Sequence, residues 1–285
     1  MGTLGKVTIG DTYPARIMGV INLTNDSFFS GSVRKSPEEI RAKAKKMHEE
    51  GADLIDLGAR STAPYKKFDI PASLETKILT EGVRTVRTAT DLPISADTVR
   101  LEPAKAALKH GASILNHVYG LSGRDSAKIA KLVVSKDADL LLVGHEDTRT
   151  KNFSDSPIDR VVQALENSLG FCKKQGIDES KITVDPGIGF FKDERISNVE
   201  WNSDVLGKLE KLRLFGRPIC VGLSRKRFLG TLIGDKPPEE RLHASTAGNA
   251  LAVYNGAHAI RTHDVRASRE AALVTRAIRE KRFIQ

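Results

Sequence analysis

Residues 36–58 read SPEEIRAKAKKMHEEGADLIDLG and contain one helix pattern followed by one strand pattern. The helix opens with Ser-Pro-Glu-Glu at 36–39, which supplies an N-cap, a proline in the first position and two acidic residues in the first turn. Apolar residues three and four positions apart then share one face, and Gly51 ends the helix. Residues 53–58 are mostly apolar, which is typical of a buried strand. The stretch therefore predicts one repeat of an alternating helix and strand architecture.

Seven more such strands occur along the chain, with amphipathic helix patterns between them. Eight strands alternating with helices over this length predict a (β/α)8 TIM barrel, to which an open doubly wound sheet is the alternative. No linker divides the chain, so we expect residues 1–285 to form a single domain. Residues 1–16 should contain a short hairpin, Lys6–Ile9 against Ala15–Met18, that plugs the bottom of the barrel. The eight expected strands are Ile17–Asn22, Asp53–Gly58, Ile94–Thr98, Ser113–Asn116, Asp139–Gly144, Lys181–Asp185, Pro218–Leu223 and His258–Thr262.

Composition narrows the class of protein. The 285 residues include 45 basic and 36 acidic side chains, a net charge of +9, and 40% of the residues are apolar. This apolar fraction argues against disorder, and no apolar run reaches the roughly 18 residues of a membrane helix. The basic residues are dispersed among acidic ones, which disfavours nucleic acid and suits an anionic small-molecule substrate. Two isolated cysteines and the absence of a signal-peptide pattern favour the cytoplasm.

Polar side chains gather where the expected strands end. One such residue alone usually caps a helix or fixes a turn. Many of them at one mouth are costly to bury unless a ligand or mutual pairing satisfies them. The active site of such a barrel lies at this end, so we take the set as candidate site residues. They are Asn22, Asp56, Asp97, Asn116, His145, Asp185, Ser224, Arg225, Lys226, Arg261 and His263.

The chemistry of this set suggests a flat heterocycle with a phosphate group. Asp97, Asn116 and Asp185 offer acceptors to an amidine-like donor edge, which a carboxylate grips with paired hydrogen bonds. Lys226 could donate to a ring nitrogen or carbonyl. Arg261 and His263 follow the last strand and lie where these barrels often hold phosphate. Asn22 and the Thr24–Ser27 loop could contact a diphosphate bridged by Mg²⁺.

Other apparent motifs are better explained by structure. Gly187-Ile188-Gly189 begins like a dinucleotide-binding loop, but Lys192 replaces the third glycine, so a glycine turn is favoured. His145-Glu146-Asp147 has metal-ligand residue types without spaced partners. Cys172 and Cys220 lie on apolar faces and are expected to be core residues.

In order along the chain, these residues resemble dihydropteroate synthase, a family of pterin-binding (β/α)8 enzymes. The Ser-Arg-Lys loop at 224–226 is the most discriminating match, and the matches span nearly the whole chain. They comprise residues 18–28 (MGVINLTNDSF), 51–58 (GADLIDLG), Ser61-Thr62, 94–98 (ISADT), 185–190 (DPGIGF), 222–226 (GLSRK), 228–230 (FLG) and 261–265 (RTHDV).

The resemblance implies a reaction in which an arylamine displaces diphosphate from the hydroxymethyl carbon of a pterin. It implies that Lys226, Arg261 and His263 are catalytic, that Mg²⁺ is the cofactor, and that a homodimer forms, through the last two helices. By position, it implies that the pterin is held by Asp97, Asn116, Asp185 and Lys226. The diphosphate and acceptor would be held by Asn22 (with Mg²⁺), Arg60, Thr62, Ser224, Arg261 and His263.

The sequence departs from the family pattern in its loops. Ala63 stands where the family has an arginine, and Arg60 lies on the other side of Ser61-Thr62 and could replace it. Asn25, His117 and Phe191 stand where Pro, Asp and Gly are expected. The acceptor is therefore p-aminobenzoate or, as an alternative, the phosphoribosylated aminobenzene of methanopterin-type pathways. A third alternative is a pterin-binding paralogue, either a corrinoid-dependent methyltransferase or a binder without turnover, against which the Ser-Arg-Lys loop and the Arg261/His263 pair argue.

Overall fold

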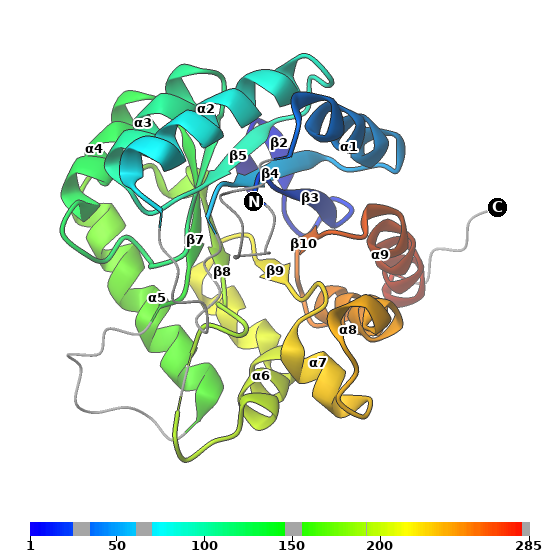
Figure 1. Ribbon diagram of the computed structural model, residues 1–285. Coiled ribbons are helices and arrows are strands. Elements are labelled where there is room, and N and C mark those ends of the chain that lie inside the picture. The colour runs from blue at the N-terminus through cyan, green and yellow to red at the C-terminus, as the bar shows by residue number, and fades with distance from the viewer. Residues whose placement is uncertain (25–34, 61–69, 146–155, 192, 281–285) are drawn as a thin grey trace.

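Eight parallel strands form the centre of the molecule, and helices surround them (Figure 1). The computed structural model describes residues 1–24, 35–60, 70–145, 156–191 and 193–280. The strand order is β8-β7-β6-β5-β4-β3-β10-β9, and a parallel bridge between Val184 and Ile219 joins the two ends. The predicted (β/α)8 barrel is confirmed, and the open doubly wound alternative is wrong. The strands are β3 (Arg16–Asn22), β4 (Leu54–Gly58), β5 (Ile94–Asp97), β6 (Ile114–His117), β7 (Asp139–Val143), β8 (Ile182–Asp185), β9 (Cys220–Gly222) and β10 (Ala259–Thr262).

The helix at residues 37–49 begins where its capping residues predict. Ser36 and Glu39 form a capping box, in which the Ser36 hydroxyl accepts from the Glu39 amide at 3.2 Å and the Glu39 carboxylate accepts from the Ser36 amide at 2.7 Å. None of the described helices is long and apolar enough to cross a bilayer. The helices are α1 (Pro37–Glu49), α2 (Ala72–Arg87), α3 (Leu101–Lys109), α4 (Ser126–Ser135), α5 (Pro157–Lys174), α6 (Asn198–Gly207), α7 (Arg227–Leu232), α8 (Leu242–Tyr254) and α9 (Val265–Arg279), with 3₁₀ turns η1 (Glu179–Lys181), η2 (Leu209–Phe215) and η3 (Pro238–Glu240).

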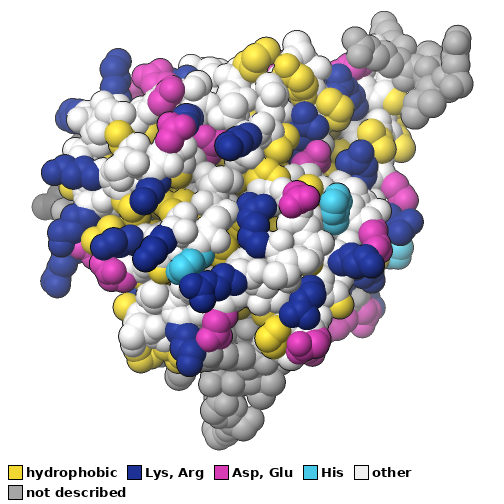
Figure 2. Space-filling model, turned by 90° about the horizontal axis from the view of Figure 1, so that it is seen from above, with side chains coloured by type: hydrophobic (Ala, Val, Ile, Leu, Met, Phe, Trp, Pro, Cys, Tyr) yellow, Lys and Arg dark blue, Asp and Glu magenta, His cyan; other side chains and the backbone are white. Residues whose placement is uncertain are grey.

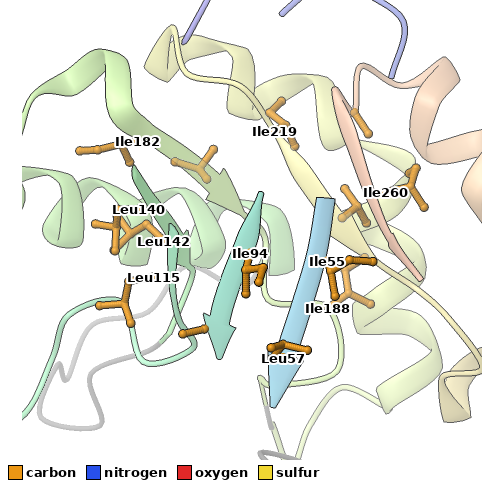
Figure 3. Packing of buried hydrophobic residues seen from close by; sticks show 14 of the residues in the cluster. Ile55, Leu57, Ile94, Leu115, Leu140, Leu142, Ile182, Ile188, Ile219 and Ile260 are labelled. Carbon is orange, nitrogen blue, oxygen red and sulfur yellow. The ribbon is translucent and has the colours of Figure 1, made fainter. Parts of the chain in front are cut away.

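The main hydrophobic core lies between the strands and the ring of helices. Outward-facing aliphatic side chains of neighbouring strands, such as Ile55, Ile94 and Leu142, are fully buried in it (Figure 3). Strands covered on both faces carry apolar residues almost without alternation, which explains the continuous apolar runs in the sequence. Outside this core, Lys and Arg side chains are spread over the face in Figure 2 with acidic side chains between them.

A second, smaller core closes the bottom of the barrel. Strands β1 (Gly2–Leu4) and β2 (Val7–Ile9) pair as a hairpin around Gly5 and Lys6, which both have positive φ, +63° and +73°. The Asp139 carboxylate accepts hydrogen bonds from the Gly5 amide at 2.6 Å and from the Thr3 hydroxyl at 3.2 Å. We call the buried apolar residues here the floor: Leu4, Ile9, Met18, Leu54, Ile114, Leu141, Cys220 and Ala259.

The predicted hairpin therefore exists and plugs the barrel, but its pairing was wrong. Residues 15–18 do not pair with residues 6–9; residues 16–18 belong to β3, which pairs in parallel with β4 and β10. Ile17 and Met18 are buried on opposite faces of β3, as in a strand covered on both faces, and Met18 is one of the floor residues.

Candidate active site

Inward-facing side chains change from apolar to polar two residues above the floor. Each of three polar residues lies two positions after a floor residue of the same strand: Asp56 after Leu54, Asn116 after Ile114, and Arg261 after Ala259. Because successive side chains of a strand alternate between faces, these residues also face the barrel interior. Asp97 is in register with Asn116, and Asp185 with Val143. We call this layer the polar ring, and it consists of Asp56, Asp97, Asn116, Asp185 and Arg261.

Arg261 connects two carboxylates across the barrel. Its Nε donates to Asp56 Oδ2 at 2.7 Å and its Nη2 donates to Asp97 Oδ2 at 2.9 Å. Asn116 Nδ2 lies 3.4 Å from the same oxygen of Asp56. Asp56 was predicted as a candidate at a strand end, without a role of its own. The structure places it at the centre of this network. β4 and β10 are not neighbours in the sheet, so no local pattern in the sequence reveals their contact.

The network has charges and acceptors to offer a ligand. Burial raises the pKa of the Asp97 carboxyl, although the charges of Arg261 and Arg60 act in the opposite direction. Burial disfavours the charged form of Arg261, but Asp56 and Asp97 outweigh this and raise its pKa. Asp56 Oδ1, Asp97 Oδ1 and Asn116 Oδ1 are buried and have no hydrogen-bond partner among the described residues. Unpaired buried acceptors are costly, so these atoms favour a ligand with hydrogen-bond donors.

The loop after β8 holds both Asp185 and Lys226. The Gly187 amide donates to Asp185 Oδ1 at 2.7 Å, and the Lys226 ammonium donates to the Ile188 carbonyl. The ammonium nitrogen also lies 5.1 Å from the centre of the Phe190 ring. Burial lowers the pKa of Lys226 to about 8, although the Asp185 carboxylate opposes this shift. Burial likewise raises the pKa of Asp185, and Lys226 opposes it.

The glycines of this loop confirm the structural interpretation of Gly187-Ile188-Gly189. Gly187 has φ +70°, and a Cβ there would lie 2.4 Å from the Gly144 carbonyl oxygen. Gly189 has φ +84°, and its missing side chain leaves room for Lys226. The loop is a glycine turn that brings backbone close to the site, while Lys192 lies outside the described residues. Phe191 is buried against Trp201, with ring centres 5.3 Å apart.

Ser224 and His263 meet at the mouth of the barrel. Ser224 Oγ accepts from the His263 amide at 3.1 Å and lies 3.0 Å from His263 Nδ1. Burial lowers the pKa of His263 to about 4, and the charge of Arg261 adds to the effect, so the imidazole is neutral at pH 7. Asn22 ends β3 with an exposed side chain, level with Gly58 of β4.

The remaining candidates lie apart from the polar ring or outside the described residues. Thr62, Glu146 and Asp147 are not described, nor are residues 25–27 of the first loop. His117 is buried, and its Nδ1 accepts from the Leu121 amide at 3.1 Å. Cys172 and Cys220 are free and buried, as predicted. Within the parts of the chain that are described, no group of three or more His, Cys, Asp or Glu side chains is placed to hold a metal ion.

Comparison with known proteins identifies the family of the chain. Residues 18–263 match the model of a family described as pterin binding enzyme. Dihydropteroate synthase of Bacillus subtilis (strain 168) is 32% identical over 250 residues, which cover 88% of this chain and 84% of that protein.

Solved structures give the same result. Xanthomonas albilineans dihydropteroate synthase with 4-aminobenzoic acid is similar with a TM-score of 0.82 at 32% identity, covering 93% of each chain. The same enzyme in complex with 7,8-dihydropteroate is similar with a TM-score of 0.79 at 31% identity, covering 93% of this chain and 94% of that one.

Proposed function

The chain belongs to the dihydropteroate synthase family of pterin binding enzymes, and we propose that its polar ring is the pterin site of that activity. The chain is a transferase that condenses 6-hydroxymethyl-7,8-dihydropterin diphosphate with an arylamine, p-aminobenzoate, and releases diphosphate. The observation that carries the proposed site is the set of buried, unpartnered acceptor oxygens on Asp97 and Asn116. A pterin presents a planar edge of N–H donors, which is the complement these oxygens require.

In this proposal each residue of the ring has its own contact. Asp185 Oδ2 accepts from the amidine-like edge of the pterin, because Oδ1 already accepts from the Gly187 amide. Asp97 and Asn116 accept further ring donors, and the Lys226 ammonium donates to a ring nitrogen or carbonyl. The ring donor takes the unpartnered Oδ1 of Asp97, so Arg261 keeps its hydrogen bond to Oδ2 and can direct a remaining N–H donor to a diphosphate oxygen.

The diphosphate then lies above the ring, at the mouth. Arg261 is its proposed cationic contact, and the neutral His263 is a hydrogen-bond donor, because Ser224 Oγ can donate to Nδ1 and leave the proton on Nε2. Arg60, whose charge acts on Asp97, is the candidate to replace the loop arginine of the family. Donors fixed before the reaction stabilise the charge that develops on the leaving diphosphate.

Mg²⁺ fits this end of the barrel as an ion held mainly by the substrate. Asn22 offers one amide oxygen, and Mg²⁺ commonly binds through one or two protein oxygens together with substrate phosphates and water. When bound, Mg²⁺ would neutralise charge on the departing diphosphate. Asn22 and the phosphates would hold it, while Arg261 and His263 orient the same anion from the side of β10.

A diphosphate-release assay tests the function. The pterin diphosphate is incubated with p-aminobenzoate, with its phosphoribosylated relative, or with no amine. Release that depends on p-aminobenzoate is the expected result, and release only with the phosphoribosylated amine would identify the alternative acceptor. No release with either amine would contradict the proposal and favour a paralogue without this activity.

A homodimer through α8 and α9 is part of the proposal. These helices pack on each other and expose large apolar side chains, among them Tyr254 at 57%, Val274 at 59% and Ile278 at 66% of full exposure. Exposed apolar patches on a protein of this kind favour association. Light scattering should give a dimer mass for the natural chain and a monomer mass for Ile278→Glu.

Two buried, free cysteines also support the cytoplasmic location expected from the sequence.

A further inference from the structure

Arg225, the middle residue of the Ser-Arg-Lys loop, has an unusual backbone. Its φ is +56°, a left-handed conformation that residues other than glycine seldom adopt. Such a conformation persists only where the surroundings hold it in place, and it is found preferentially at functional sites. The two residues beside it, Ser224 and Lys226, are both part of the proposed site.

The side chain of Arg225 is fully engaged by the protein itself. Nε and Nη2 donate to the two oxygens of the Asp264 carboxylate at 3.0 and 2.9 Å. Nη1 donates to the carbonyls of Pro238 and Glu239, each at 3.1 Å. These four hydrogen bonds use four of the five N–H donors of a guanidinium. Arg225 therefore has little left to offer a substrate.

The backbone of Arg225 is held as firmly. Its amide donates to Ser245 Oγ at 2.8 Å, and its carbonyl accepts from Arg241 Nη1 at 3.0 Å. Ser245 lies in α8 and is buried. The peptide groups on both sides of Arg225 are thus fixed from α8 and from the segment that precedes it.

Its partner Asp264 connects this loop to the end of β10. Asp264 directly follows His263, and its own amide donates to Thr262 Oγ1 at 3.0 Å. The hydrogen bond from Arg225 lowers the pKa of the Asp264 carboxyl below its ordinary value, although burial acts in the opposite direction. A bidentate Arg–carboxylate pair fixes orientation as well as distance. Ser224 Oγ and His263 Nδ1, which belong to the same two loops, lie 3.0 Å apart.

We propose that Arg225 is a positioning residue, whose pairing with Asp264 sets the distance between Lys226 at the ring end of the site and His263 at the diphosphate end. The inference rests on the proposed function, since those two residues are the proposed pterin and diphosphate contacts. Arg225 does not contact substrate. It locks the loop after β9 to the loop after β10, so that one rigid unit presents both contacts to one pterin diphosphate.

Steady-state kinetics of matched variants tests this. Arg225→Ala is compared with Arg16→Ala, because Arg16 also pairs with an aspartate, Asp53, at the opposite end of the barrel, through one contact at 3.3 Å. Side-chain exposures are 30% and 20% for Arg225 and Asp264, and 22% and 18% for Arg16 and Asp53. Both variants lose an Arg–Asp pair of similar exposure, and the melting temperature should fall more in Arg225→Ala, which loses four side-chain hydrogen bonds against two in Arg16→Ala. Arg225→Lys keeps the charge but cannot form the planar fork.

We expect Arg225→Ala to lower kcat/KM by about tenfold to a hundredfold, mainly through a higher KM for the pterin diphosphate, since a small displacement of binding groups has effects of this order. Arg225→Lys should recover little of the loss, and Arg16→Ala should leave kcat/KM unchanged. Arg225→Ala combined with Asp264→Ala should be no worse than Arg225→Ala alone, because the two side chains act as one unit. Natural kinetics in Arg225→Ala, or an equal loss in Arg16→Ala, would overturn the inference.

Hydrogen exchange separates this inference from the proposed function. If the natural chain released no diphosphate with either amine, the proposed function would fail, and the lock between the loops would still be measurable. Amides of residues 222–226 and 262–265 should exchange faster together in Arg225→Ala but not in Arg16→Ala. Unchanged exchange in either segment would overturn the inference whatever the activity.

Discussion

Replacing Asp185 by Asn should nearly abolish pterin binding, because the loop after β8 dictates which way the new side chain faces. In the protein, Asp185 Oδ1 accepts from the Gly187 amide at 2.7 Å. An N–H donor cannot face an NH2 group, so the Asn oxygen must take the place of Oδ1. The NH2 group then occupies the position of Oδ2, where it meets the donor edge of the pterin.

The cost follows from two losses at one atom. A hydrogen bond to a charged group contributes about 1.5–3 kcal/mol, and leaving donors unsatisfied in a buried site costs about 1–3 kcal/mol more. Together they give roughly 2.5–6 kcal/mol, which is on the order of a 10²- to 10⁴-fold weaker Kd. The estimate applies to binding of the pterin and not to folding, because the hydrogen bond to Gly187 is kept.

Isothermal titration calorimetry with a pterin measures this effect, and Asp139→Asn is the matched control. Asp139 also faces into the barrel and accepts from a glycine amide, that of Gly5 at 2.6 Å, but it does so below the floor. We expect Asp139→Asn to lower the melting temperature and to bind the pterin as the natural chain does. An Asp185→Asn variant that is folded and binds the pterin with natural affinity would refute the assignment of Asp185 as the acceptor of the donor edge.

Four further predictions concern the site and the core. Since burial lowers the pKa of Lys226 to about 8 and the protonated form is the donor, kcat/KM should fall as pH rises through about 8, and Lys226→Met should lack this limb of the pH profile. Arg60→Ala should weaken the binding of the pterin diphosphate but not of a pterin without phosphate; equal affinity for both in the variant and the natural chain would eliminate Arg60 as the substitute for Ala63. Burial raises the pKa of Cys172 to about 12 and that of Cys220 well above its ordinary value, so a thiol reagent should label neither until denaturant is added. Gly5→Ala should cost roughly 1–3 kcal/mol in denaturant unfolding, because φ is +63° and the added Cβ would lie 2.5 Å from Pro93 Cβ.

The barrel could be predicted because its signal is local and repeated. The helix after Ser36 is indicated by its cap and its apolar face, and each strand by a short apolar run, so that the eight barrel strands are predicted with ends within a residue or two. The hairpin shows where this fails. Residues 15–18 were predicted as a strand, but their sequence does not say whether the partner is residues 6–9 or the parallel strands β4 and β10.

Side-chain partners across the barrel could not be predicted from the sequence for a related reason. Asp97, Asn116 and Arg261 were found at strand ends, and the structure brings them to one layer. That Arg261 would pair with Asp56 as well as Asp97 depends on contacts between strands that are not neighbours in the sheet. Arg225 was likewise seen only as part of a motif, since its partner Asp264 lies 39 residues further along the chain.

The closed floor also determines the order in which ligands bind and leave. Because Leu4 and Ile9 fill the bottom of the barrel, a ligand that binds Asp97 and Asp185 cannot enter from that end and is expected to enter and leave where the strands end. In the proposed site the pterin binds deeper in the barrel than the amine, and an amine bound above it would block its path. The pterin diphosphate should therefore bind before the amine, and the condensed product should dissociate before the next turnover can start.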